Sequence, residues 1–220
     1  MQGWIVTIDE DLHRRCRREV ERAFPDVDLQ DEPVRERCDD KMRGCYESHI
    51  ARYRAWLSRP GNDPWSVVFE EDLVVPGPST RIDTWVAAVR AVDPDFDVLY
   101  LGHRFVWEQQ TSFHRVAPNL LRVRTNDLHA YVLSRRFATH MVENHGTFAG
   151  DAIDVIVREE AHRAYAVTPM LAYQRGLNGL AQRGATLMLW PGELFATYRR
   201  RAWWVAGVTL GTLVAWAFVG

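Results

Sequence analysis

The stretch "WSVVFEEDLVVPG", from Trp65 to Gly77, decides the fold class of this 220-residue chain. Its apolar, mostly β-branched residues flank three consecutive acids, Glu70, Glu71 and Asp72, and a Pro-Gly-Pro turn follows. Such a run is typical of a buried strand that ends at a turn. Because carboxylates are costly to bury, the acids predict a strand that leaves the core and delivers them to a cleft, where a cation offsets their charge.

Strand and helix patterns alternate on both sides of this stretch. "GWIVTI" and "DFDVLYLG" are typical of strands, whereas "EDLHRRCRREVERAF", "YESHIARYRAWLSRPG" and "TRIDTWVAAVRAV" have helical spacing. The alternation predicts one α/β domain with a mainly parallel central sheet covered by helices. Ligand sites in such sheets lie at the carboxyl ends of strands, which is where the acidic triplet stands.

The overall composition excludes some classes of partner and site. The formal net charge of −2 gives no electrostatic reason to expect a nucleic acid as a partner. The three cysteines, Cys16, Cys38 and Cys45, are too few and too scattered for a disulfide framework or a zinc cluster. We therefore expect reduced thiols in a domain that faces the cytosol.

The last nineteen residues have a different character from the rest. From Ala202 to Gly220 the sequence "AWWVAGVTLGTLVAWAFVG" carries no charge, and at roughly 1.5 Å per helical residue it is about long enough to cross a bilayer core. Three arginines precede it, and tryptophans stand near both its ends. We predict a catalytic domain over residues 1–198, then a basic flank and a C-terminal hydrophobic helix over 199–220. This helix would be a single-pass transmembrane anchor that leaves the domain in the cytosol.

A helix docked on the domain, or lying in the membrane interface, is the alternative interpretation of this segment. Such a helix needs a polar face for water, and the sequence offers none. The spanning anchor is therefore the preferred interpretation.

The acidic triplet is a candidate metal site. Along an ideal strand, Glu70 and Asp72 point to the same side and Glu71 to the other. Hard carboxylate oxygens favour Mg²⁺ or Mn²⁺, and such ions commonly keep positions open for phosphate oxygens. We therefore predict that Glu70 and Asp72 hold the ion, although acids also follow strands in turns that bind no metal.

Several segments share their order with a known family. The series "GCYESH", "VVFEEDLVV", "DFDVLYLG", "HAYVLSRRFA", "AIDVIV" and "PMLAYQ" resembles glycosyltransferase family 25, which includes lipooligosaccharide glycosyltransferases and procollagen galactosyltransferases. The likeness extends from about Trp4 to Gln174. The family's acidic motif is Glu-Asp-Asp, so Glu71 departs from it at the position that alternation turns away from the ion.

This resemblance implies a fold and an activity. The fold would be of the GT-A type, a nucleotide-sugar-binding α/β sandwich. The enzyme would be an inverting hexosyltransferase that moves a sugar such as galactose or glucose from a nucleotide diphosphate donor, a UDP-sugar, to a hydroxyl of a glycan or protein acceptor.

The resemblance also implies donor-binding residues. Gly44, Ser48 and His49 match the family's Gly-Cys-x-x-Ser-His pattern. Our helix prediction places Ser48 and His49 just inside a helix start, where free amides favour a diphosphate, with helix capping as the alternative. Arg14 and Gln174 match further family positions. Arg14 also belongs to a basic helix face, and Gln174 would serve equally well to satisfy backbone groups.

The resemblance implies an inverting transfer, and an inverting transfer needs a base to remove the acceptor proton. Asp154 in "AIDVIV" resembles the family's Pro-Val-Asp segment, with Ala152 in the proline position. Asp154 is the predicted base. Asp151 is the alternative base. Another interpretation is that Asp154 is not a base and makes only a structural hydrogen bond.

Together these features predict a membrane-tethered, Mn²⁺- or Mg²⁺-dependent glycosyltransferase. One rival is a catalytically silent relative that binds a sugar or a partner. The other is a metal-dependent phosphohydrolase, which needs a second cluster of Asp and His ligands that "HGTFAGDAID" does not convincingly supply.

Overall fold

The computed structural model describes residues 1–7, 9–31, 38–61, 63–103 and 112–175. Chain contacts separate a unit of residues 1–179 from a unit of residues 180–220, and the second unit lies outside the described residues. The predicted boundary near residue 198 and the predicted membrane span at 202–220 lie outside them as well. Among the described helices, none has the length and apolar character needed to cross a bilayer.

The described residues alternate between strands and helices, as the sequence predicts. The helices are α1 (Glu10–Ala23), α2 (Lys41–Ser58), α3 (Ile82–Val92), α4 (Arg135–Asn144) and α5 (Ile153–Glu160). The strands are β1 (Gln2–Val6), β2 (Asp28–Leu29), β3 (Trp65–Glu70), β4 (Leu73–Val74), β5 (Val98–Tyr100), β6 (Ser112–Ala117), β7 (Leu120–Arg124), β8 (Ala130–Ser134), β9 (Ala164–Val167) and β10 (Tyr173–Gln174).

Within the described residues, eight strands form one sheet in the order β2-β1-β3-β8-β5-β9-β7-β6, and β10 pairs separately with β4. In the large sheet, β7 and β8 run antiparallel to all the other strands. The prediction of an α/β domain with a mainly parallel sheet is therefore confirmed.

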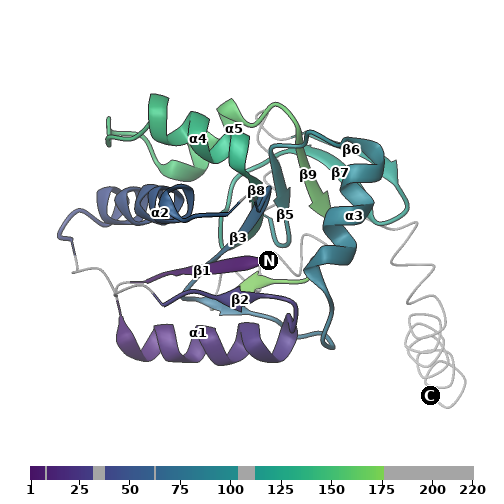
Figure 1. Cartoon of the computed structure of the whole chain (residues 1–220), viewed down its shortest axis with the longest axis horizontal. Coiled ribbons are helices and arrows are strands. Elements are labelled where there is room, and N and C mark those ends of the chain that lie inside the picture. Colours follow the sequence, from purple (N-terminus) through teal and green to yellow (C-terminus); the bar gives the residue numbers. More distant parts are fainter. Residues whose placement is uncertain (8, 32–37, 62, 104–111, 176–220) are drawn as a thin grey trace, which may run out of the picture. The chain divides into compact units, whose positions relative to one another are not determined.

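Helices cover both faces of this sheet (Figure 1). On one face α2 packs against α4 and α5, and on the other α1 contacts β1 and β4. Side chains of α1 and α3 share one core cluster with Val67 and Phe69 of β3. Because strand side chains alternate, Val68 and Glu70 belong to the opposite face, toward α2. The fold thus aims the last residue of β3 at α2.

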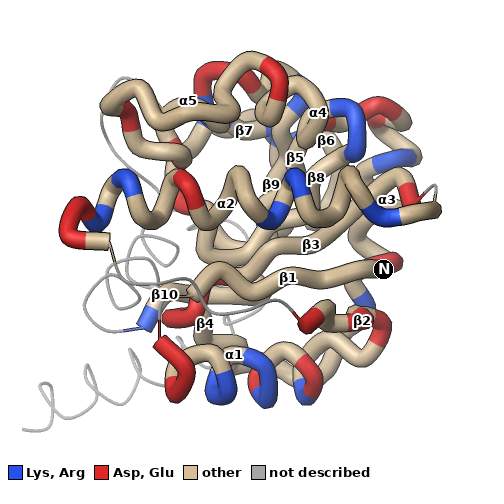
Figure 2. The backbone as a smooth tube through the Cα atoms, turned by 60° about the vertical axis from the view of Figure 1, so that its left-hand side comes forward, with Lys and Arg blue, Asp and Glu red and all other residues tan. Residues whose placement is uncertain are grey.

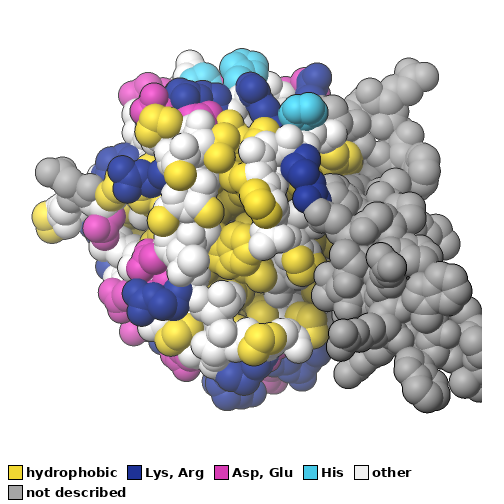
Figure 3. Space-filling view, turned by 90° about the vertical axis from the view of Figure 1, so that its right-hand side faces the viewer, with side chains coloured by type: hydrophobic (Ala, Val, Ile, Leu, Met, Phe, Trp, Pro, Cys, Tyr) yellow, Lys and Arg dark blue, Asp and Glu magenta, His cyan; other side chains and the backbone are white. Residues whose placement is uncertain are grey.

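Charged residues are frequent along the helices and in the connections between elements. Figure 2 shows basic and acidic positions alternating along α1, and acidic positions beside β4 and β10. On the face shown in Figure 3, apolar side chains gather near the centre and charged groups lie at the rim. Exposed apolar atoms of this kind are common on globular proteins.

Candidate active site

The acidic triplet lies where β3 ends. The strand β3 ends with Glu70. The next two residues, Glu71 and Asp72, form a turn, and β4 begins at Leu73. All three acids line one cavity of about 230 Å³. The expectation that Glu71 points away from the other two is therefore wrong, because alternation holds only while the backbone stays extended and the turn ends it.

Glu71 has its own partner in this cavity. The hydroxyl of Thr7, the residue that follows β1, donates a hydrogen bond to Glu71 Oε2. The parallel register pairs Val6 with Glu70, so the carboxyl ends of β1 and β3 meet here. Polar residues from two neighbouring parallel strands thus converge at one edge of the sheet.

The amino end of α2 forms another wall of the cavity. Asp40 caps the helix by accepting a hydrogen bond from the Arg43 amide at 3.1 Å, so the helix begins at Lys41. Ser48 and His49 therefore lie two turns inside the helix, and the prediction that they stand at its start is wrong. Lys41 and Gly44 line the cavity, so the positive end of the helix dipole borders it.

Gly44 allows a close approach of the chain to this helix. A Cβ atom added at Gly44 would lie 2.9 Å from the Cβ of Cys38, closer than real Cβ atoms approach other groups. Cys38, Cys45 and Ser48 also line the cavity, and Ser48 Oγ donates to the Gly44 carbonyl at 2.7 Å. Ser48 therefore uses its one hydroxyl proton inside the helix and has no second proton to donate to a phosphate oxygen.

His49 is fully buried between the cavity and the sheet. Its Nε2 lies 3.1 Å from Glu70 Oε1, and its Nδ1 lies 2.8 Å from the Tyr131 hydroxyl. Burial alone would lower the pKa of His49, but hydrogen bonds with Cys45 and Glu70 outweigh it and raise the pKa to about 9. At neutral pH, His49 is therefore an imidazolium that donates to Glu70 and to Tyr131.

Glu70 is the anionic partner of this imidazolium. Burial would raise the pKa of Glu70, yet the hydrogen bond from His49 and its charge lower it overall. Gln174 adds a further hydrogen bond to Glu70, since β10 pairs with β4 and places Gln174 opposite Leu73. The structure thus brings together Glu70, His49 and Gln174, three residues predicted for the site.

Asp72 is the acid of the cavity whose ionisation is most disfavoured. Burial is the main cause that raises its pKa to about 7, and the negative charges of Glu70, Glu71 and Asp127 raise it further. Its Oδ1 is buried and has no hydrogen-bond partner within the described residues. A buried, unpaired carboxylate oxygen beside two more acids fits a hard divalent cation, which would replace the proton.

Arg14 lies away from this cavity. Its side chain is 58% exposed on α1, where it pairs with Asp11 and lies 3.9 Å from Glu10. Its predicted role at the donor site therefore gains no support from its position.

Asp154 and Asp151 also lie off the cavity lining. Asp154 stands in the first turn of α5, and its Oδ1 accepts a hydrogen bond from the Val155 amide at 2.9 Å. Asp151 is exposed just before that helix. Neither residue lines the cavity described above.

Sequence reasoning missed Thr7 and Lys41, which line the cavity, and Asp127, whose charge acts on Asp72. The position of Thr7 directly after a strand parallel to β3 was a usable signal. Asp127, by contrast, is buried in a left-handed backbone conformation, with φ of 77°, in the β7–β8 connection. Its electrostatic effect on Asp72 arises from tertiary structure alone.

Fold and cavity together define an α/β protein with an acidic, cation-compatible pocket at the carboxyl edge of a mainly parallel sheet. No protein-family model and no curated protein matches the sequence. The resemblance to glycosyltransferase family 25 therefore stays a prediction.

Two solved structures are distantly similar to this chain. One is A197 from STIV, with 13% identity, coverage of 79% of this chain and 84% of that chain, and a TM-score of 0.49. The other is a glycosyltransferase involved in the glycosylation of the major capsid of PBCV-1, with 10% identity, coverage of 83% and 98%, and a TM-score of 0.38. Because both sequence identities and both TM-scores are this low, neither structure indicates the function of this chain.

Proposed function

We propose that this protein is a metal-dependent glycosyltransferase whose cation site is the acidic cavity at the end of β3. The observation that carries the proposal is the convergence of Glu70, Glu71 and Asp72 on one cavity, with a buried and unpartnered oxygen on Asp72. Asp72 would be the primary ligand, and the other two acids would complete the carboxylate set. A bound Mn²⁺ or Mg²⁺ would neutralise charge on a diphosphate leaving group.

The residues around the acids have distinct proposed tasks. Lys41 and the first turn of α2 would attract the donor diphosphate, because both present positive charge to the cavity. The His49 imidazolium and Gln174 would hold the Glu70 carboxylate in place. A cavity of about 230 Å³ is smaller than the roughly 300–1,000 Å³ of complete small-molecule sites, so it suits the metal and diphosphate part of the donor.

The finer assignments rest on the family resemblance. The donor would be a UDP-sugar carrying galactose or glucose, and the acceptor a hydroxyl of a glycan or protein. Asp154 remains the proposed base for an inverting transfer, with Asp151 as the alternative. The C-terminal segment would tether the enzyme to a membrane.

The test is a screen of nucleotide sugars with the purified full chain, with Mn²⁺ and with a chelator. We expect metal-dependent consumption of one donor, and loss of that turnover in Asp72→Asn. Asp11→Asn, which changes an exposed acid on α1, is the matched control and should keep full activity. Metal and nucleotide binding without turnover of any donor would indicate the silent relative instead.

The base assignment has its own test. Asp154→Asn should lower turnover by orders of magnitude while leaving donor affinity nearly unchanged, because a general base acts in the transition state. Asp151→Asn is the parallel variant. If only Asp151→Asn lowers turnover, the role moves to Asp151.

A further inference from the structure

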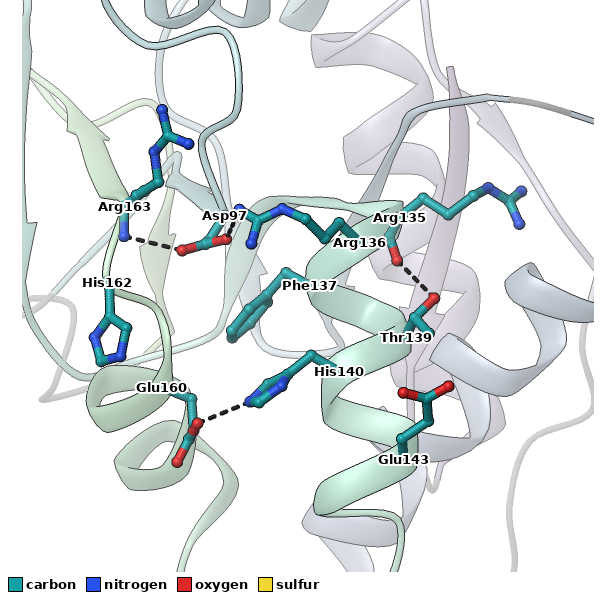
Figure 4. A pocket seen from close by; sticks show the side chains of 10 residues that line it. All are labelled: Asp97, Arg135, Arg136, Phe137, Thr139, His140, Glu143, Glu160, His162 and Arg163. Carbon is teal, nitrogen blue, oxygen red and sulfur yellow. Dashed lines mark hydrogen bonds and ion pairs between the residues drawn. The ribbon is translucent and has the colours of Figure 1, made fainter.

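A second cavity, of about 590 Å³, lies beside α4 and away from the acidic cavity. Figure 4 shows His140 of α4 facing Glu160 at the end of α5, with a hydrogen bond between them, and His162 farther along the same wall. None of the residues predicted for the active site lines this cavity. It is therefore a separate feature of the fold.

His140 and Glu160, which line this cavity, form a compact group of metal-ligating side chains with the neighbouring His145. His140 Nε2 lies 2.8 Å from Glu160 Oε2, and His145 Nε2 lies 3.4 Å from Glu160 Oε1. One ligand atom from each of the three residues falls within 4.8 Å of the others. Zinc lies about 2.0–2.2 Å from such ligand atoms, so small side-chain rotations suffice to place one ion between all three.

The surrounding helices favour a cation at this position. α4 ends at Asn144, with His145 as its C-cap, and α5 ends at Glu160. Both helices thus direct the negative ends of their dipoles to the cluster, where a positive charge is stabilised and a carboxylate is not. Glu160 therefore needs a cationic neighbour.

The orientation of His140 suits metal binding. His140 Nδ1 lies 3.1 Å from the Asn144 side-chain amide, which holds the ring with Nε2 toward Glu160. In this arrangement Asn144 Nδ2 donates to His140 Nδ1. When Nε2 binds a metal, Nδ1 carries the proton, and the Asn144 amide has to turn over so that its oxygen accepts that proton.

We propose that His140, His145 and Glu160 bind a transition-metal ion of the zinc type. Imidazole ligands favour Zn²⁺, Cu²⁺ or Ni²⁺ over Mg²⁺ and Mn²⁺, so this site differs in metal preference from the carboxylate site. Three protein ligands leave one position open, and the side chains of His140, His145 and Glu160 are 41%, 24% and 32% exposed, so water can reach it.

The ion would join the ends of two helices and steady a third. The Tyr46 hydroxyl of α2 donates to the His145 carbonyl at 2.6 Å, and α2 packs against both α4 and α5. Metal binding to the folded chain stabilises it by mass action. With the ion at about 100 times its Kd, we expect the Tm to rise by roughly 5–10 °C.

The test is a Co²⁺ titration of the metal-stripped full chain, because Co²⁺ reports its ligands by absorption. In a chain that carries Asp72→Asn, and so lacks the carboxylate site, we expect visible d–d bands that saturate at one ion per chain. We expect no near-ultraviolet band of a cobalt–thiolate bond, and we expect Zn²⁺ to displace the Co²⁺. His140→Gln and His145→Gln should abolish this signal. His114→Gln, which changes an exposed histidine on β6, is the matched control and should retain it.

A parallel variant separates this cluster from the acidic cavity. Cys45, His49 and Glu70 also lie close enough to hold an ion, so Cys45→Ser is titrated alongside. Unchanged d–d bands in Cys45→Ser support the proposal. A signal lost in Cys45→Ser, or one that survives in His140→Gln and His145→Gln, would overturn it.

Thermal unfolding gives an independent measurement. Zn²⁺ should raise the Tm of the parent chain but not that of Glu160→Gln, whose side chain has the same size without the charge. Circular dichroism checks that each variant folds. A Zn²⁺-induced shift of equal size in the parent and in Glu160→Gln would contradict the proposed site.

Discussion

Asp72 is the residue whose charge state most affects the acidic cavity. Its pKa rises from the ordinary 3.8 to about 7, because burial and neighbouring acids disfavour the carboxylate. The folded chain therefore holds a proton on Asp72 across a pH range in which the unfolded chain does not. A divalent ion and this proton compete for the same oxygen.

Asp72→Asn should change how stability depends on pH. The stability that protonated Asp72 contributes is fully present below pH 4 and is lost as pH rises toward 7. With a chelator present, the free energy of unfolding of the parent chain should fall by a few kcal/mol relative to that of Asp72→Asn over this pH range. Each unit of pKa shift corresponds to ~1.4 kcal/mol. Urea unfolding at several pH values measures the difference. Parallel pH profiles for the two proteins would argue against the raised pKa.

Mn²⁺ should reverse this difference above pH 7. The ion replaces the proton on the parent chain and stabilises it, whereas Asp72→Asn lacks the ligand charge. We expect the Tm of the parent to rise with Mn²⁺ and that of the variant to stay unchanged. Equal Tm shifts in both proteins would show that Asp72 is not a ligand of the metal.

The pair of buried His49 and part-buried Glu70 provides the third residue-scale prediction. His49→Gln leaves the Glu70 carboxylate without its cationic partner. Breaking a fully buried pair costs about 3–5 kcal/mol, which is an upper bound here because the Glu70 side chain is 19% exposed. Tyr131→Phe removes one hydrogen bond to the same imidazole and one to the buried Tyr53 hydroxyl, and should cost about 1–3 kcal/mol. Denaturant unfolding of both variants gives the comparison, and a double variant with Glu70→Gln should recover part of the loss.

At the scale of secondary-structure elements, the amino end of α2 matters most for the site. Asp40 sets the first residue of the helix, and the first turn then presents Lys41 and Gly44 to the cavity. The turn after β3 matters equally, because it redirects Glu71 into the same cavity. Two element ends therefore build the site, while the middles of those elements form the core.

Asp40→Ala should weaken the start of α2. Loss of an N-cap typically costs about 1 kcal/mol, and fraying of this turn should also lower donor affinity. Asp39→Ala removes an acid of the same size from the adjacent exposed position and is the matched control. Unfolding free energy and donor binding are the two measurements. Equal effects of both variants would mean that charge, rather than capping, is responsible.

At the scale of the whole molecule, the sheet collects residues that are far apart in sequence. Four site residues come from different elements: Thr7 directly follows β1, His49 lies in α2, Glu70 ends β3 and Gln174 ends β10. The fold brings them to one edge of the sheet. The second unit, residues 180–220, carries the apolar segment that the sequence predicts as an anchor.

The anchor prediction is tested by fractionation. The full chain should sediment with membranes and resist high-salt extraction, because about nineteen apolar residues favour lipid over water. A chain that ends at Tyr198 should stay in the supernatant and keep its donor turnover. Recovery of the full chain in the soluble fraction without detergent would contradict the anchor prediction. Protection of the domain from protease in sealed vesicles would show that the anchor has the opposite orientation.

The sequence by itself determined the α/β class, the mainly parallel sheet and the strand that carries Glu70, because apolar periodicity is a local signal. It also indicated that Gln174 and His49 belong near the acids, through the family resemblance. Tertiary structure alone decided that Glu71 enters the cavity and that Arg14 and Asp154 lie elsewhere. These outcomes depend on which strands meet and on how the chain turns between them, and such long-range packing leaves no periodic pattern in the sequence.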